Sequence, residues 1–374
     1  MVKVTGFRVS LLTALLTLAF YAVLSQTQLM RSLEGMSLDF RFQLSGVTKP
    51  GRDVAVVLID DKSVAEIGRW PWGRATIAKM VDQLAAAGAR VIALDMLFLD
   101  PESRVSGEAV AGLEDLVRTL DGAALGTALE AVRSRLPALV AQLGLDEDAV
   151  LGQAMARAGK VVVPFSFVFA APGSDPAPPS VPPDFIEASA FRTLRLVAGQ
   201  DPRFALASRG LLAPLPAIGA NAKALGHANV AIDVDGSARF EYPVLEYAGQ
   251  YYPSFAVQIA REFLGLAPEE VGIDFASGLR VGGKLVPTDN YMRLLANLYG
   301  PEQTFPTYAF SDVALGRVPD DAFAGKAVLI GANAVGISDV FVTPYSAVVP
   351  GVERNANIVD NILSERFLQR PRLS

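Results

Sequence analysis

The hydrophobic pattern of this chain opens with one long segment that carries no charge. Residues 9–30 lie between Arg8 and Arg31, and none of these 22 residues is charged. At a rise of about 1.5 Å per residue, a helix of this length covers the roughly 30 Å hydrocarbon core of a bilayer. The pattern therefore predicts a transmembrane helix over residues 9–30.

The same segment also has features of a cleaved signal peptide. Lys3 and Arg8 give it a basic start, and its apolar core is short. No clear cleavage site with small residues follows it, so we favour a retained anchor. The two basic residues favour a cytoplasmic position for residues 1–8, which would place the rest of the chain outside the cytoplasm.

A helical stalk is predicted over residues 31–45, continuous with the anchor. Apolar residues alternate spacings of four and three along it: Leu29, Leu33, Met36 and Phe40. Such a stripe is typical of the seam between two coiled helices. Because the stripe is short, two interpretations stay open. The helix packs on its own domain, or it forms the seam of a homodimer.

Residues 46–368 have the pattern of a mixed α/β domain. Continuous apolar runs predict strands buried on both faces, over residues 53–60, 90–95, 160–169 and 326–330. Helical spacing over residues 74–87 joins the first two runs as a β-α-β unit, which implies parallel strands. Antiparallel strands are expected over residues 226–250, further strands over residues 279–286 and 291–299, and a closing helix over residues 356–367. We therefore predict an α/β fold with a mixed, partly parallel sheet and flanking helices.

Two segments interrupt this alternation of strands and helices. Residues 104–159 are rich in alanine and leucine with scattered charges, which predicts a helical insertion. Residues 171–184 are rich in proline, and they are expected to form a solvated flap.

Composition excludes several classes of function. With a net charge of −6 and no basic run beyond the flanks of the anchor, the chain is not expected to bind nucleic acid. The lack of cysteine excludes disulfides and thiolate metal sites. The single histidine, His227, excludes zinc motifs that need two, and we expect it to be structural. The glycine-rich residues 278–284 lack the Ser or Thr of a phosphate-binding P-loop, and they indicate a hairpin turn.

Acidic side chains follow the first two predicted strands. Asp60 and Asp61 end the first strand, and Asp95 ends the second. Ligands of parallel sheets bind beyond the carboxyl ends of the strands, where facing carboxylates hold a cation or take up protons. Acidic residues are also common caps of helices and loops, and this structural interpretation is the one we favour.

Both tryptophans of the chain, Trp70 and Trp72, lie beside Arg69 just before a predicted helix. Indole rings offer flat stacking surfaces, and arginine clamps anions. We favour a packing role, since paired tryptophans are usually buried. If the domain binds a small ligand, the predicted pocket consists of Asp60, Asp61, Arg69, Trp70, Trp72 and Asp95.

Several segments together resemble the CHASE type-two domain, an extracellular sensor family of bacterial membrane receptors. The matching segments are residues 56–63, 67–74, 88–95, 233–239, 323–332, 339–344, 350–353 and 356–363, with Asn229. They span almost the whole chain past residue 30. Residues 104–145 are longer than the usual connection, and Arg354-Asn355 stands where such sequences often have an aliphatic residue and a histidine.

The resemblance implies a sensor between one N-terminal membrane helix and several C-terminal ones. Residues 369–374 would then begin a link to the next membrane helix. The protein would lie in the bacterial inner membrane with its main domain in the periplasm, and a homodimer would pass on an unknown small-molecule, ion or protein signal.

The same resemblance implies a cytoplasmic output domain, most often an adenylate or guanylate cyclase. A histidine kinase, a serine/threonine kinase or a diguanylate cyclase is the alternative. ATP and magnesium are expected only in such a cyclase domain, and this segment is expected to hold no catalytic residue, cofactor or metal.

Two other functions stay open. One is a periplasmic hydrolase that uses the carboxylates near Asp60 and Asp95, with or without a metal. Carboxylates at metal-ligand distances would favour it, and splayed ones would not. The other is a purely structural dimeriser that receives its signal through membrane partners.

Overall fold

The computed structural model of the chain describes residues 9–18, 20, 27–102, 147–170, 179–196, 202–334, 336 and 339–369. Several predictions concern residues outside this part: the terminus 1–8, most of the insertion (103–146), residues 171–178 of the flap, and the link 370–374. The predicted span is covered in part, since residues 19 and 21–26 are not described. No helix among the described residues combines the length and apolar character needed to cross a membrane.

A seven-stranded, largely parallel sheet forms the centre of the domain. Its strands lie in the order β15 (Thr307–Ala309), β1 (Val54–Ile59), β16 (Ala327–Ala332), β2 (Val91–Asp95), β3 (Val161–Val168) and β5 (Gly210–Leu212), and β6 (Ala224–His227) also pairs with β3. Only the pairing of β3 with β5 is antiparallel. This mixed sheet confirms the predicted α/β class.

The two strands of the predicted β-α-β unit are parallel but do not pair with each other. β16 lies between them, and its Ile330 is in register with Val57 of β1 and with Leu94 of β2. Nearly every residue of β16 is buried. A strand that is apolar on both faces is most stable with a neighbour on each side, which explains its central place.

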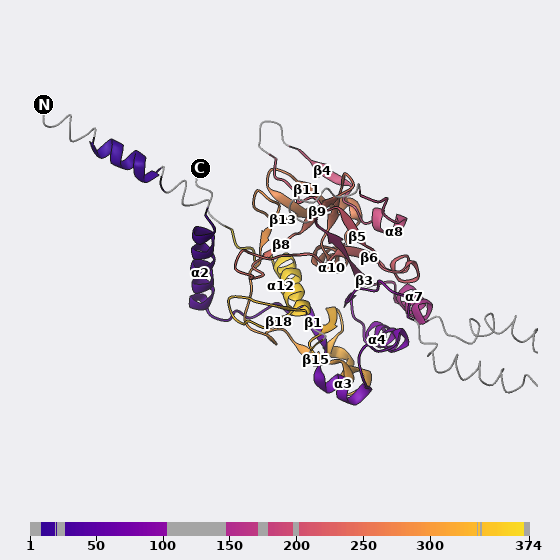
Figure 1. Cartoon of the computed structure of the whole chain (residues 1–374). Coiled ribbons are helices and arrows are strands. Elements are labelled where there is room, and N and C mark those ends of the chain that lie inside the picture. Colours follow the sequence, from indigo (N-terminus) through magenta and orange to yellow (C-terminus); the bar gives the residue numbers. More distant parts are fainter. Residues whose placement is uncertain are drawn as a thin grey trace, which may run out of the picture.

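Helices cover both faces of this sheet. Alternate residues of β1 point to opposite sides: Val56 belongs to the core under α10 (Phe255–Leu264) and α12 (Gly351–Ser364), and Val57 to the core under α4 (Arg74–Ala86) and α7 (Glu147–Ala158). Figure 1 shows α12 and α4 on opposite sides of β1. The short helices α3 (Asp61–Ile67) and α11 (Phe310–Ala314) pack on each other beside α4.

α12 begins at Gly351, earlier than the predicted start at residue 356. Its first turn buries two charged side chains, Glu353 and Arg354. Charges at core positions break the apolar spacing by which a helix is recognised, and this is why its first turn was not predicted.

Smaller sheets complete the domain. A four-stranded sheet has the order β13 (Lys284–Pro287), β12 (Gly278–Val281), β11 (Val271–Asp274) and β4 (Thr193–Arg195), and a three-stranded sheet has the order β14 (Leu294–Leu295), β8 (Phe240–Glu241) and β7 (Val230–Ala231). The remaining strand pairs are β9 (Val244–Tyr247) with β10 (Gln250–Pro253) and β17 (Val340–Phe341) with β18 (Val349–Pro350). Short helices are α8 (Asp184–Glu187), α9 (Pro216–Gly219), η1 (Pro268–Glu270) and η2 (Asp320–Ala322). The hairpin predicted at residues 278–284 is confirmed, because β12 and β13 pair antiparallel around Gly282, whose φ is 60°.

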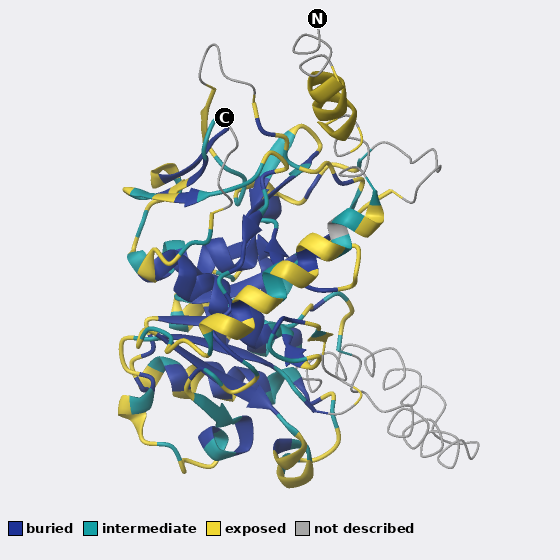
Figure 2. Ribbon diagram, turned by 90° about the vertical axis from the view of Figure 1, so that its left-hand side faces the viewer, coloured by how far each residue is buried: buried dark blue, intermediate teal, exposed yellow. Residues whose placement is uncertain are grey.

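The predicted stalk is the helix α2 (Gln28–Ser45), which begins separately from the preceding segment. Thr27 is extended (φ −79°, ψ 151°), and its Oγ1 accepts a hydrogen bond from Met30 N at 3.3 Å. The prediction of one uninterrupted helix from anchor to stalk is therefore wrong at Thr27, because the threonine caps a new helix. Figure 2 shows α2 crossing the domain, with exposed residues along its outer side.

Candidate functional site

The acidic residues of the predicted pocket do not converge on one point. Asp60 caps α3, and its Oδ1 accepts hydrogen bonds from Ser63 N at 2.8 Å and Ser63 Oγ at 2.6 Å. Asp61 lies exposed in the first turn of the same helix. Asp95 ends β2, on the far side of β16. With strands about 4.8 Å apart, the backbones of Asp60 and Asp95 are separated by roughly 10 Å.

The two tryptophans pack against the domain. Trp72 is buried, its indole Nε1 donates to Gly68 O at 2.7 Å, and its ring lies 4.8 Å from that of Phe310. Trp70 meets Trp72 edge to face at 5.3 Å and is half-buried, and Arg69 is exposed. This geometry fits the packing interpretation better than a stacking site for a ligand.

Asp95 is half-buried beneath α12. Its Oδ2 accepts a hydrogen bond from Asn355 Nδ2 at 3.0 Å. Burial raises the pKa of Asp95 to about 6, and the bond from Asn355 opposes that shift. Asp95 therefore takes part in fastening α12 to the end of β2.

A denser group of contacts surrounds residues 239–241, which we call the junction segment. It consists of Arg239 and the two residues of β8, Phe240 and Glu241. Arg239 ends the segment 233–239 that resembles the sensor family, but the sequence did not predict a role for any of the three residues. Arg239 contacts α2, and Phe240 and Glu241 both contact Arg354 of α12.

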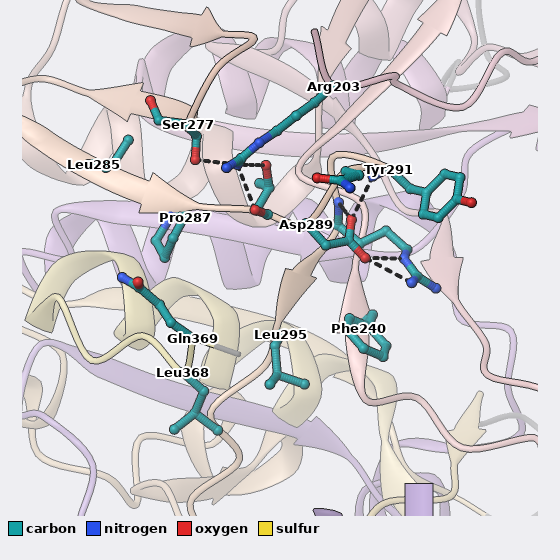
Figure 3. Close-up of a pocket in the computed structure, with 13 residues that line it drawn as sticks. Arg203, Phe240, Ser277, Leu285, Pro287, Asp289, Tyr291, Leu295, Leu368 and Gln369 are labelled. Atoms are coloured by element: carbon teal, nitrogen blue, oxygen red, sulfur yellow. Dashed lines mark hydrogen bonds and ion pairs between the residues drawn. The ribbon is translucent and has the colours of Figure 1, made fainter. Parts of the chain in front are cut away.

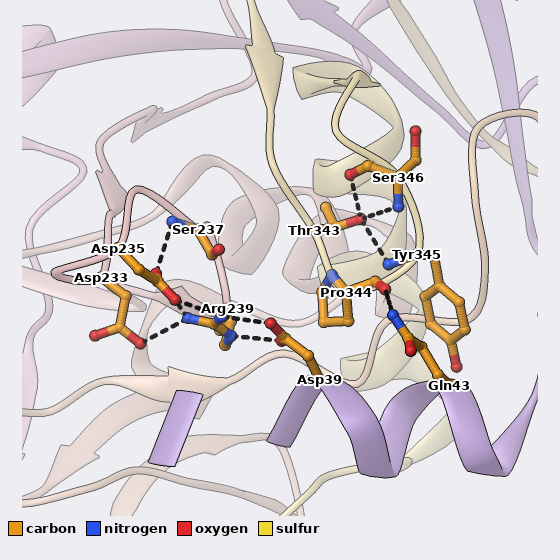
Figure 4. A network of polar contacts seen from close by, with 10 residues as sticks. All are labelled: Asp39, Gln43, Asp233, Asp235, Ser237, Arg239, Thr343, Pro344, Tyr345 and Ser346. Carbon is orange, nitrogen blue, oxygen red and sulfur yellow. Dashed lines mark hydrogen bonds and ion pairs between the residues drawn. The ribbon is translucent and has the colours of Figure 1, made fainter. Parts of the chain in front are cut away.

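Arg239 fastens α2 to the domain. Its side chain is only 1% exposed, and it binds Asp39 of α2 through two hydrogen bonds, Nε to Oδ1 at 2.7 Å and Nη2 to Oδ2 at 2.6 Å (Figure 4). The guanidinium also pairs with Asp235 at 2.7 Å and Asp233 at 3.2 Å. These bonds lower the pKa of Asp235 to about 2. A buried guanidinium held by carboxylates in this way is a specific and directional link.

A glycine makes this close approach possible. Gly35 lies one turn before Asp39 on α2, and a Cβ atom there would come within 3.0 Å of Arg239 Nη1. At the other end of α2, Tyr345 donates its hydroxyl to Phe42 O at 3.0 Å, and Gln43 Nε2 donates to Pro344 O at 3.1 Å. α2 is thus held to the domain along its length.

Glu241 fastens α12 to the same segment. Its Oε2 lies 2.8 Å from Arg354 Nη1, and the two side chains are only 3% and 1% exposed. Arg354 Nη2 also donates to Phe240 O. Burial raises the pKa of Glu241, and the charge of Arg354 opposes the shift. Between them, Arg239 and Glu241 connect the first described long helix to the last.

The outer side of α2 leaves the predicted apolar stripe uncovered. Leu29, Leu33, Met36 and Phe40 are 65%, 48%, 64% and 64% exposed. The inner side packs on the domain through Leu38 and the buried Phe42. The helix therefore packs on its own domain, as one interpretation predicted, and still presents a stripe that is free for another partner.

The start of α2 and the end of the described chain lie side by side. A groove of about 700 Å³ is lined by Met30 and Leu33 of α2 and by Leu368 and Gln369. A movement of α2 relative to the domain would therefore reach the segment that follows α12.

Glu353, in the first turn of α12, is a buried acid with an incomplete set of partners. It is 1% exposed, its Oε2 accepts from Gln303 N at 2.6 Å, and its Oε1 has no partner among the described residues. Burial raises the pKa of Glu353 to about 7. Below about pH 7, the carboxyl group of Glu353 in the folded domain is therefore mostly protonated.

Stability is expected to fall as the pH rises from about 4.5 to about 7, by about 3 kcal/mol from this residue alone. Stability falls in this direction because the pKa of Glu353 is higher in the folded state than in the unfolded state. The contribution of Glu353 to the free energy of unfolding is complete below the unfolded pKa, and it is lost as the pH rises through the folded pKa. Glu353→Gln should remove most of this dependence in urea unfolding measured across pH. Glu365→Gln, at a side chain that is 59% exposed, is the control and should retain the wild-type slope. Equal slopes in wild type and Glu353→Gln would contradict the assignment.

His227 is completely buried, and its ring nitrogens have no hydrogen-bond partner among the described residues. Its ring packs 5.9 Å from Phe167, and burial lowers its pKa to about 3. A neutral imidazole inside an aromatic cluster agrees with the predicted structural role. In the described part of the chain, no three histidine, aspartate or glutamate residues lie together as metal ligands would.

Comparison with known families finds a match over most of the chain. The family profile described as the CHASE2 domain matches residues 13–374, which is nearly the full chain. No curated protein and no solved structure matches significantly.

Proposed function

The chain belongs to the CHASE2 domain family of extracellular sensory domains, and on that basis we propose that it is the extracytoplasmic sensor of a transmembrane signalling receptor. In this proposal residues 9–30 anchor the protein in the bacterial inner membrane. Residues 1–8 lie in the cytoplasm, and the main domain lies in the periplasm.

The observation that most supports a signalling role is the double connection of the junction segment. Arg239 binds α2 through Asp39, and Glu241 binds α12 through Arg354. A signal needs a two-state element with a differential affinity for its ligand. In our proposal the junction segment and the two helices that it holds form this element, because a shift of the junction segment would move both helices.

We propose that the receptor works as a homodimer whose seam includes the exposed stripe of α2. Four apolar residues in helical spacing, all at least 48% exposed, are costly to leave in water and suit the same stripe on a second copy. Rearrangement of this dimer would regulate an output domain on the C-terminal side, for which we propose an adenylate cyclase that makes cyclic AMP. ATP and magnesium would bind in that domain, and a histidine or serine/threonine kinase in its place would respond to the same rearrangement.

The double variant Leu33→Glu/Met36→Glu tests the dimer. Like charges facing each other across the seam should weaken dimerisation by on the order of a hundredfold or more, as seen by analytical ultracentrifugation. Because both side chains are exposed, the melting temperature of the monomer should stay within a few degrees of wild type. In the full receptor, the same variant should lose regulation of the output.

Leu315→Glu is the matched control, because Leu315 is 56% exposed and ends α11, which packs on α3, α4, β1 and β15. It should leave dimerisation and output unchanged. A double variant that dimerises like wild type would show that the stripe of α2 is not the dimer interface. A double variant that unfolds would show that the stripe belongs to the domain core.

The alternative of a carboxylate-dependent hydrolase finds less support in this geometry. Such a site needs acidic side chains that converge, whereas Asp60 and Asp95 lie on either side of β16 and are each engaged, with Ser63 and Asn355 respectively.

A further inference from the structure

A second groove, of about 820 Å³, lies beside the junction segment. Small-molecule sites in proteins are usually concave, mostly apolar and of this size. Figure 3 shows Arg203 and Ser277 at one end of the groove and Phe240, Leu295 and Leu368 at the other. None of the residues in the predicted pocket lines it.

Arg203 is a buried cation whose bonding partners are all neutral. It is 5% exposed, and its Nη1 donates to Ser277 O, to Thr288 O at 2.6 Å and to Thr288 Oγ1 at 2.8 Å. No carboxylate of the described residues forms an ion pair with it. A buried charge normally has an opposite charge beside it, and the described residues provide none for this arginine.

The free edge of this guanidinium has the shape of a carboxylate receptor. All its hydrogen bonds to described residues come from Nη1. Nε and Nη2 donate to no described residue, and neither is among the buried polar atoms that lack a partner, so both are accessible from the groove. These two groups therefore remain available along one side of the planar fork. Two parallel N–H donors match the two oxygens of a single carboxylate.

The other charged residues of the groove are already paired. Arg293 binds Asp289 at 2.8 Å, and its guanidinium stacks on Phe240 at 4.4 Å and on Tyr291 at 5.5 Å. Among the residues that the structure describes, Arg203 is the charged side chain of the groove that has no ion-pair partner. The remaining wall is largely apolar and includes Leu285, Pro287, Leu295 and Leu368.

We infer that this groove binds an organic monocarboxylate with an apolar body, held by Arg203 through its carboxylate and by the apolar wall through its carbon skeleton. The inference deepens the proposed sensory function, on which its biological role rests, by naming the class of signal. A monoanion balances the positive charge of Arg203, which has no ion pair with the described residues, whereas a phosphate dianion would leave an excess negative charge in a half-buried site.

The position of the groove explains how such a ligand would act. Phe240 of the junction segment is part of its wall, and Phe240 is flanked by the residues that hold α2 and α12. Leu368 and Gln369, which follow α12, line both this groove and the groove beside α2. A ligand there contacts the residues that a signal must move.

Calorimetric titration of the purified chain tests the site, with phenylacetate and hexanoate as probes and with phenylacetamide, hexanamide and inorganic phosphate as comparisons. The carboxylates should bind at least about tenfold more tightly than the amides or phosphate, because charge-assisted hydrogen bonds are lost with the amides. Arg203→Met should weaken carboxylate binding by about tenfold to a hundredfold. Arg280→Met, at a nearby arginine that does not line the groove, should bind like wild type.

A second variant keeps the test decisive if Arg203→Met does not fold. Leu285→Glu places a negative charge at the rim of the groove, at a side chain that is 38% exposed, and should also weaken carboxylate binding by about tenfold. Amides that bind as well as carboxylates, a Leu285→Glu variant that binds normally, or no binding of either carboxylate to wild type would each overturn the inference. Because the readout is binding alone, such a failure would leave the dimer and output test of the proposed function intact.

Discussion

Replacing Arg354 with methionine is expected to destabilise the fold by about 3–5 kcal/mol in urea unfolding at neutral pH. The substitution leaves the carboxylate of Glu241, 3% exposed, buried without its counter-charge. It also removes the hydrogen bond to Phe240 O, so α12 loses its polar attachment to β8. A cost of this size is a large share of the stability of an ordinary domain.

The double variant Arg354→Met/Glu241→Met serves as the internal control. It removes both charges, so it should recover at least half of the lost stability. The single variant should also recover as the pH falls, because the unpaired Glu241, whose pKa is already raised by burial, then takes up a proton. A double variant as unstable as the single one would show that packing, and not the ion pair, carries the effect.

Arg239→Met is expected to cost about 3 kcal/mol and to release α2 from the domain. Arg239 is 1% exposed and is surrounded by Asp39, Asp233 and Asp235, which would repel one another without it. Hydrogen exchange should show the amides of α2 losing protection before those of the central sheet.

An exposed arginine provides the comparison for this variant. Arg192 pairs with Glu269 at a site where the two side chains are 55% and 57% exposed, so Arg192→Met should leave the stability close to that of wild type. If Arg239→Met reduced stability as little as Arg192→Met, or if the amides of α2 kept their protection, the link between α2 and the junction segment would not contribute to the stability of the fold.

The strands and helices of the central layer were predictable because burial on both faces leaves a plain pattern. β1, β2, β3 and β16 are continuous apolar runs, and α4 keeps its apolar spacing from Ile77 to Leu84. Their order was not predictable, since β16 enters the middle of the sheet from far along the chain. Local periodicity contains no information about which strands become neighbours.

The junction segment escaped prediction for a different reason. β7, β8 and β14 have two residues each, too few to show alternation. Glu241 and Arg354 look like surface residues in the sequence, because charged residues are rarely buried unless paired, and the partner lies elsewhere in the chain. One signal was available: Gly35 in the middle of an amphipathic helix costs about 1 kcal/mol relative to alanine, and such a glycine often marks a close approach.

The way α2 is fastened also determines how this sensor can be transplanted. A chimera that joined another receptor to this domain at Gly46 would discard Asp39 and Phe42 and would leave Arg239 facing only Asp233 and Asp235. The recipient's own helix would then have to supply a glycine and an aspartate one turn apart, at the height of Arg239. A fusion point before Thr27 retains the cap of α2 and its contacts, so the exchangeable unit includes the helix together with the domain.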